Sequence, residues 1–161
     1  MPEALNRCSI NNVFSSLSSR DQKLIETLVR PSLQLSGISI LLVENSLDSR
    51  DLVHRLLVRA GARVTDAQSP TDAREHLKNF SPDIIVSDIG MPGEDGLAFI
   101  RSLRNEGTKE QKTIPAIALT AFVRGQDKRA ALAAGFQAHI AKPITMSVLL
   151  EAILQIIGGR R

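Results

Sequence analysis

The sequence predicts an α/β protein built on a doubly wound, five-stranded parallel sheet. Short apolar runs alternate with longer segments of helical periodicity from residue 37 onward. Glycines and helix-capping residues stand at the junctions between the two kinds of segment. Right-handed connections between parallel strands place helices on both faces of such a sheet.

The predicted strands are the five short apolar runs. The first and third runs are apolar along nearly their whole length, as is typical of parallel strands that helices cover on both faces. We therefore expect both faces of these two strands to be buried. The runs cover residues 38–43, 62–65, 83–87, 114–119 and 137–141.

The predicted helices follow the strands one by one. Gly61 and Gly135 stand where a helix C-terminus favours a residue with left-handed backbone. Ser69 and Pro70 provide a capping hydroxyl followed by a proline at the first helical position. The polar, charged stretch 105–113 predicts a loop. The helical segments cover residues 47–60, 70–80, 96–105, 125–134 and 146–157.

The length of 161 residues suits one domain with an extension. We place the domain at residues 37–158 and an N-terminal extension at residues 1–36. The Ser- and Asn-rich composition of residues 1–18 predicts disorder. Residues 19–30 have apolar side chains at helical spacing, so we expect a short helix there, ended by Pro31.

Composition and charge limit the location and the partners. Residues 1–36 contain four cations and three anions, which leaves only +2 of the total charge of +3 on residues 37–161. Cations cluster only at Arg160 and Arg161, so we expect no direct binding to nucleic acid. The single Cys8 cannot form an internal disulfide, and no apolar run is long enough for a membrane span. We expect a cytoplasmic protein that does not bind membranes.

Polar side chains follow four of the predicted strands. Ligands of open parallel sheets bind beyond the carboxyl ends of the strands, so these side chains are expected to share a site. An aspartate beside other oxygen ligands can hold Mg²⁺, and it can attack a phosphorus centre to form an acyl phosphate. A lysine and a hydroxyl would stabilise the transferred group. The residues are Glu44 and Asn45, Asp88, Thr120, and Lys142.

Residues 37–158 resemble the receiver domains of response regulators and hybrid histidine kinases, the CheY-like superfamily. The resemblance depends on four motifs in order: LVEN at residues 42–45, SDIGMPGEDG at 87–96, ALTA at 118–121 and AKP at 141–143. It implies a flavodoxin-like (βα)5 receiver fold with strand order 2-1-3-4-5.

The resemblance also implies a role for each motif position. Asp88 would be the phosphoacceptor, and Lys142 would pair with the phosphoryl group through a cis bond to Pro143. Thr120 would hydrogen-bond to the phosphoryl group and act as a switch together with His139. The implied Mg²⁺ ligands are Glu44, Asn45, Asp88 and the backbone carbonyl of Gly90.

Asn45 departs from the family pattern. Members usually have two adjacent acids after the first strand, and the second acid binds the metal directly. An amide oxygen can coordinate Mg²⁺ but carries no full charge, and two unit charges 4 Å apart interact by about 4 kcal/mol at an effective dielectric near 20. We therefore expect weakened metal binding. Asp48 could compensate, although we expect it to cap or line the first turn of its helix.

The sequence therefore predicts a phosphoaccepting receiver module of a two-component phosphorelay. A histidine kinase or phosphotransfer protein would donate the phosphoryl group to Asp88 in a Mg²⁺-dependent reaction, and altered partner binding would carry the signal. The module would catalyse only its own phosphorylation and dephosphorylation. The alternative is a pseudo-receiver that binds partners with little or no phosphorylation, because of Asn45. We expect no output domain after residue 158, and a homodimer is compatible with the family.

A phosphatase that uses an aspartate nucleophile is a weaker alternative. Such enzymes generally need a second aspartate two residues later as a general acid, and Gly90 stands there. A nucleotide-binding protein is also disfavoured, because no Gly-rich phosphate loop follows the first strand.

Overall fold

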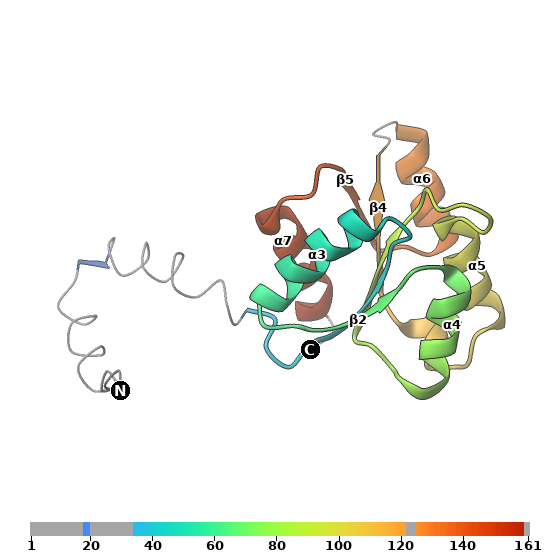
Figure 1. Ribbon diagram of the computed structural model, residues 1–161, viewed down its shortest axis with the longest axis horizontal. Helices are drawn as coiled ribbons and strands as arrows, with labels where there is room; N and C mark the ends of the chain where they lie inside the picture. The colour runs from blue at the N-terminus through green and yellow to red at the C-terminus, as the bar shows by residue number, and fades with distance from the viewer. Residues whose placement is uncertain (1–17, 20–33, 122–124, 160–161) are drawn as a thin grey trace.

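The computed structural model describes residues 18–19, 34–121 and 125–159 of the chain. Within them, five parallel strands form one sheet in the order β2-β1-β3-β4-β5. Helices α3 and α7 cover one face of the sheet, and α4, α5 and α6 cover the other (Figure 1). The predicted fold class and strand order are confirmed.

The strands begin and end close to the predicted positions. They are β1 (Ser39–Val43), β2 (Arg63–Ala67), β3 (Ile84–Asp88), β4 (Ala116–Thr120) and β5 (Ala138–Ala141). Strand β2 continues two residues further than predicted, because its register with β1 extends to the pair Val43 and Ala67. Strand β4 starts after Pro115, which has no N–H for the ladder but accepts a hydrogen bond from Ile85 N at 2.9 Å.

The helices also match the prediction, with one addition. They are α3 (Leu47–Arg59), α4 (Pro70–Asn79), α5 (Gly96–Glu106), α6 (Gly125–Ala134) and α7 (Met146–Gly158). The expected loop 105–113 contains a short 3₁₀ helix, η2 (Gln111–Thr113). Thr108 and Gln111 explain it: Gln111 N donates to Thr108 Oγ1 at 3.3 Å, and Thr108 N donates to Gln111 Oε1 at 3.0 Å. This reciprocal pair is a capping box, a pattern that the sequence contains.

Caps and turns form as the sequence indicates. The side chain of Ser69 accepts a hydrogen bond from Asp72 N at 3.1 Å, and Pro70 takes the first position of α4. Gly61 and Gly135 have φ angles of 93° and 108°, in the left-handed region that disfavours side chains. These residues end α3 and α6 and turn the chain back toward the sheet.

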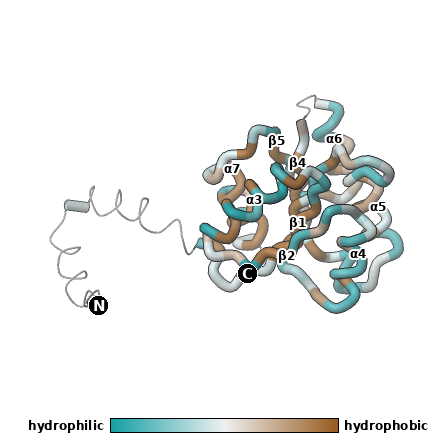
Figure 2. The backbone as a smooth tube through the Cα atoms, viewed as in Figure 1, coloured by the Kyte–Doolittle hydropathy of each residue, from teal (hydrophilic) through white to brown (hydrophobic). Residues whose placement is uncertain are grey.

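Two apolar layers hold the sheet between the helices. The core cluster beneath α3 and α7 includes Ile40, Leu57 and Ile153, and the cluster beneath α4, α5 and α6 includes Leu41, Phe99 and Phe136. Figure 2 shows hydrophobic colouring concentrated along the central strands. Strands β3 and β4 are buried throughout, and so is β1 after its first residue. The expectation for the first and third strands is therefore confirmed.

The packed body includes residues upstream of the expected boundary at Gly37. Leu35 is fully buried against the α3 side of the core, and its N–H donates to Ala60 O at 2.8 Å. The helix expected at residues 19–30 lies outside the described residues except for Ser19, and so does the disorder expected at residues 1–18 except for Ser18. None of the helices in the described ranges is both long and apolar enough to cross a bilayer.

Candidate functional site

A cleft of about 330 Å³ lies where the carboxyl ends of the strands meet, as the sequence predicts for this fold. Its walls come from the residues that follow β1 and β5, and from the last residues of β3 and β4 with the residues directly after them. The predicted site residues line it, with one exception: His139 is half-buried on β5, paired in the ladder with Ala118, and is not a lining residue. The lining residues are Glu44, Asn45, Ser46, Asp88, Ile89, Gly90, Thr120, Ala121 and Lys142.

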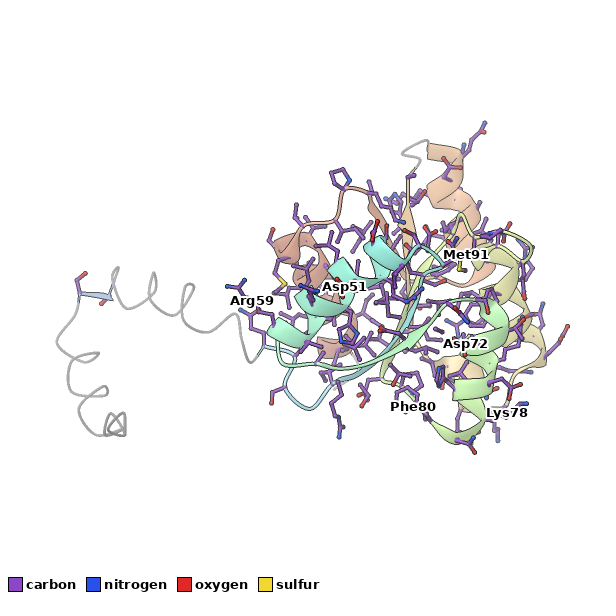
Figure 3. All side chains as sticks on the ribbon, viewed as in Figure 1. Asp51, Arg59, Asp72, Lys78, Phe80 and Met91 are labelled. Atoms are coloured by element: carbon purple, nitrogen blue, oxygen red, sulfur yellow. The ribbon has the colours of Figure 1, made fainter. Side chains whose placement is uncertain are left out.

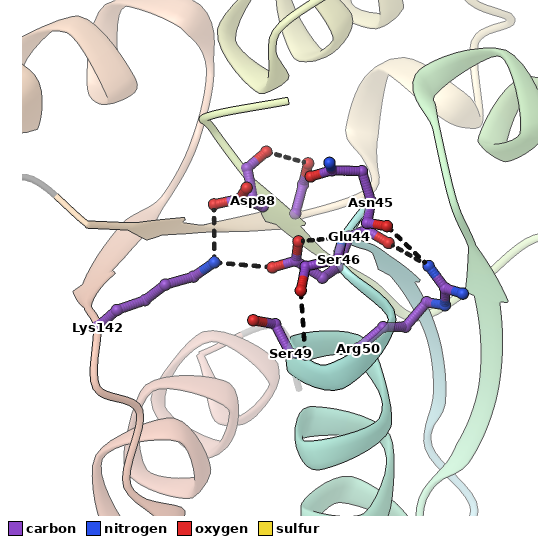
Figure 4. Close-up of polar contacts among 8 residues, drawn as sticks. Glu44, Asn45, Ser46, Ser49, Arg50, Asp88 and Lys142 are labelled. Atoms are coloured by element: carbon purple, nitrogen blue, oxygen red, sulfur yellow. Dashed lines mark hydrogen bonds and ion pairs between the residues drawn. The ribbon is translucent and has the colours of Figure 1, made fainter. Parts of the chain in front are cut away.

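Lys142 joins the two carboxylates of the cleft. Its Nζ lies 2.8 Å from Glu44 Oε2 and 3.2 Å from Asp88 Oδ1 (Figure 4). The side chain of Glu44 is only 1% exposed and that of Asp88 8%, so both charges need this partner. Burial lowers the pKa of Lys142, but the hydrogen bond to Glu44 and the charge of Asp88 outweigh it, and the pKa is raised overall. Lys142 therefore stays charged at neutral pH.

The turn between β1 and α3 holds Glu44 from two sides. Ser46 N donates to Glu44 Oε1 at 2.9 Å, so both carboxylate oxygens of Glu44 accept hydrogen bonds. Arg50 reaches back from α3 and donates to the backbone oxygen of Glu44 at 2.7 Å. Sequence reasoning did not identify Ser46 or Arg50. The position of Ser46 just before a helical segment is an N-cap signal, whereas nothing in the sequence marks Arg50.

Asp88, the last residue of β3, lines the cleft just before the loop that leads to α5. Ser87 Oγ donates to the backbone oxygen of Asp88 at 3.0 Å, and a Cβ on Gly96 would lie only 2.1 Å from that same oxygen. The first residue of α5 must therefore be a glycine for this close approach. Asp95 caps α5 by accepting a hydrogen bond from Ala98 N at 2.7 Å.

The donor atoms at the cleft suit a hard divalent cation in type. The side chains of Glu44, Asn45 and Asp88 and the backbone of Gly90 all offer oxygen, which Mg²⁺ prefers. The negative charge is modest, because Lys142 already neutralises part of it and the part of the chain that the structure describes has no cluster of three or more His, Cys, Asp or Glu side chains. The residues fit Mg²⁺, with less charge than a second acid at position 45 would provide.

Asp48 does not replace the missing acid at the cleft. The N-cap of α3 is Ser46, whose side chain accepts from Ser49 N at 3.4 Å. Asp48 lies in the first turn of the helix, exposed, and is not among the residues that line the cleft. It therefore occupies the first-turn position that the sequence favoured for it.

Comparison with known families decides the membership of the chain. The family model described as the response regulator receiver domain matches residues 40–154. The chain belongs to this family. Receiver domains are signalling modules of two-component systems rather than conventional enzymes, and they interact with histidine kinases or phosphotransfer proteins. The Lys142–Pro143 peptide bond is cis, as the resemblance implied.

Similar proteins include small proteins and segments of large kinases. An uncharacterised 14.6 kDa protein from Leptolyngbya boryana is 37% identical, and the match covers 75% of this chain and 91% of that protein. Hybrid signal transduction histidine kinase D of Dictyostelium discoideum is 40% identical over 76% of this chain, but only 8% of the kinase is covered. The region of that kinase that matches this chain is therefore a small part of the kinase.

Solved receiver domains have the same fold. The receiver domain of sensor histidine kinase PA1611 from Pseudomonas aeruginosa has a TM-score of 0.69 and 29% identity, with 76% of this chain and 99% of that chain covered. That structure has a magnesium ion coordinated in its active site cleft. The receiver domain of a signal transduction histidine kinase from Syntrophus aciditrophicus has a TM-score of 0.69 and 30% identity, over 76% of this chain and 92% of that chain.

Proposed function

We propose that this receiver domain accepts a phosphoryl group on Asp88 from a histidine kinase or phosphotransfer protein, in a Mg²⁺-dependent reaction in the cytoplasm. The observation that supports it best is the contact of Lys142 with both Glu44 and Asp88 in an open cleft. Although Asp88 is largely buried, its side chain lines that cleft, so a donor can reach it. The module would catalyse only its own phosphorylation and dephosphorylation.

The chemistry assigned to Asp88 is a nucleophilic displacement. We assign the attack to Oδ2, because Oδ1 already pairs with Lys142. A new bond forms between Oδ2 and phosphorus while the bond from phosphorus to the donor's imidazole nitrogen breaks, and the imidazole retains that electron pair. Lys142 and the hydroxyl of Thr120 would then hold phosphoryl oxygens at the same strand ends.

A metal ion would share this work. Glu44, Asn45, Asp88 and the carbonyl of Gly90 would hold Mg²⁺, directly or through water, and the bound ion would neutralise charge on the phosphoryl oxygens. We assign the ion to this cleft because all four residues line it.

Signalling would follow from a population shift. A phosphoryl group on Asp88 can contact Lys142 and Thr120 only in arrangements that bring these residues to it, so phosphorylation favours those arrangements. Thr120 ends β4 and His139 lies on β5, and we assign the switch to these two residues. The changed surface would alter binding to a partner protein, and a homodimer is one candidate form.

A pseudo-receiver is the second candidate function, favoured by one observation. Asn45 lies exposed at the cleft and brings no charge, while Lys142 already supplies a cation to both carboxylates. Such a cleft would attract Mg²⁺ weakly, and the domain would then bind partners with little or no phosphorylation.

One experiment separates the two candidates. The full chain is incubated with acetyl phosphate and Mg²⁺, and its intact mass is measured beside Asp88→Asn and beside a sample with a metal chelator. We expect one added phosphoryl group in the wild type, none in Asp88→Asn, and a strongly reduced amount with the chelator. Wild-type protein without the added mass at high Mg²⁺ concentration would instead support the pseudo-receiver.

A further inference from the structure

Arg74 on α4 forms an ion pair with the loop that follows Asp88. Its Nη1 lies 2.7 Å from Glu94 Oε2 and its Nη2 lies 2.5 Å from Glu94 Oε1, a two-pronged ion pair. Nη2 also donates to Ser102 Oγ on α5 at 2.6 Å. One guanidinium thus connects α4, the loop at residues 89–95 and α5.

This ion pair is better supported than a typical surface pair. The side chains of Arg74 and Glu94 are 37% and 33% exposed, and the guanidinium carbon lies 5.2 Å from the centre of the Phe99 ring. The ring face favours a cation, and the two parallel hydrogen bonds fix the direction of Glu94. The hydrogen bond to Glu94 also raises the pKa of Arg74. Such a pair can hold a backbone segment in place.

The loop is held at several points besides Glu94. Ile89 O accepts hydrogen bonds from Met91 N and Gly96 N at 3.0 Å each, which joins the two ends of the loop, and the buried side chain of Met91 anchors its first half. Gly93 follows with a φ of 77°, a conformation that glycine adopts easily and that adds no stiffness of its own. Glu94 comes next, so Arg74 attaches the chain to α4 directly after this glycine.

We propose that Arg74 is a positioning residue for the phosphoacceptor site: by holding Glu94 it fixes the loop at residues 89–95, and with it the backbone carbonyl of Gly90 beside Asp88. The inference rests on the proposed function, in which this carbonyl is a Mg²⁺ ligand. Residues that orient metal ligands commonly change metal affinity by about 10-fold or more when they are replaced.

The test compares two ion pairs, each of which includes a cation of α4. Arg74→Lys keeps the charge but loses the fork that matches a carboxylate, and Glu94→Gln removes the charge of its partner. Glu75→Gln is the matched control, because it also removes one acid paired with an α4 cation, Lys78, at 2.7 Å. Figure 3 shows Lys78 at the end of α4 that lies away from Met91 and the loop.

Three readouts are measured on the full chain: amide hydrogen exchange at Met91 and Gly96 by NMR, the Mg²⁺ dissociation constant by calorimetry, and the Mg²⁺ dependence of labelling by acetyl phosphate. In Arg74→Lys and Glu94→Gln we expect faster exchange in the loop and a dissociation constant raised about 10-fold. Labelling should slow at low Mg²⁺ and recover at saturating Mg²⁺. Glu75→Gln should match the wild type in all three.

The outcomes separate this inference from the proposed function. If both loop variants lower the melting temperature but keep wild-type exchange at Met91 and Gly96, the ion pair is only a structural support and the inference is wrong. If the wild type takes up no phosphoryl group, the proposed function fails, while the exchange rates still decide whether Arg74 fixes the loop. Glu94→Gln keeps the test decisive if Arg74→Lys does not fold.

Discussion

The β1–α3 turn and the β3–α5 loop meet at one cleft but are built differently. At the loop, the backbone of Asp88 at the end of β3 lies against Gly96 at the start of α5, and Arg74 holds Glu94. In the turn, buried Glu44 is followed by exposed Asn45. The difference indicates that the departure from the family pattern falls where a side chain can change without repacking. The proposed phosphoacceptor Asp88 is thus closely packed, while Asn45, a proposed metal ligand, is exposed and uncharged.

Gly96→Ala should have the largest effect on stability, because it disrupts the close packing between the end of β3 and the start of α5. The added Cβ would lie 2.1 Å from the backbone oxygen of Asp88, so the N-terminus of α5 must shift. We expect a loss of about 2 to 3 kcal/mol in the free energy of unfolding, measured by urea denaturation. Gly125→Ala is the control, since Gly125 also opens a helix but has open space around it. Equal stability of the two variants would contradict the close packing.

Asn45→Asp should sharpen the contrast by giving the exposed turn the missing charge. One added carboxylate in a partly solvated cleft should tighten Mg²⁺ binding by about 10-fold. Solvent screening makes this gain much smaller than the Coulomb energy of two charges in a dry protein interior. Calorimetry of the wild type and the variant measures this change. Asp48→Asn should bind Mg²⁺ almost like the wild type, because Asp48 does not line the cleft. A large loss of affinity in Asp48→Asn would show that this acid already serves the site.

Ser46→Ala should have the smallest of these effects. It removes the cap of α3, which stabilises a protein by about 1 kcal/mol, but leaves the backbone N–H that holds Glu44. Thermal unfolding should show a modest decrease in melting temperature. Ser69→Ala, at the cap of α4, is the matched control and should lower stability by a similar amount. If Ser46→Ala slowed labelling by acetyl phosphate more than Ser69→Ala does, the hydroxyl of Ser46 would itself take part in the site.

Most of the fold could be predicted because it depends on local rules. Apolar runs, the cap at Ser69 and the glycines at 61 and 135 each act within a few residues, and the observed element ends lie within about two residues of the predicted ones. The capping box of Thr108 and Gln111 was equally local, so η2 could have been predicted from it.

The candidate site was predictable only in part. Glu44 and Lys142 directly follow strands, and Asp88 and Thr120 end strands. Parallel strands bring their carboxyl ends together, so the meeting of these residues follows from the topology. The pair of Arg74 and Glu94 spans 20 residues and depends on how α4 is rotated against the loop. That rotation is set by packing of the whole core and not by any local pattern.

The most direct test of the account locates the phosphoryl group by residue. The full chain is labelled with acetyl phosphate and Mg²⁺, the acyl phosphate is reduced with borohydride to homoserine, and the peptides are sequenced by mass spectrometry. We expect homoserine at position 88 and at no other aspartate, and a strongly reduced amount of it without Mg²⁺. Homoserine at another position, or aspartate unchanged at position 88 after labelling at saturating Mg²⁺, would contradict it.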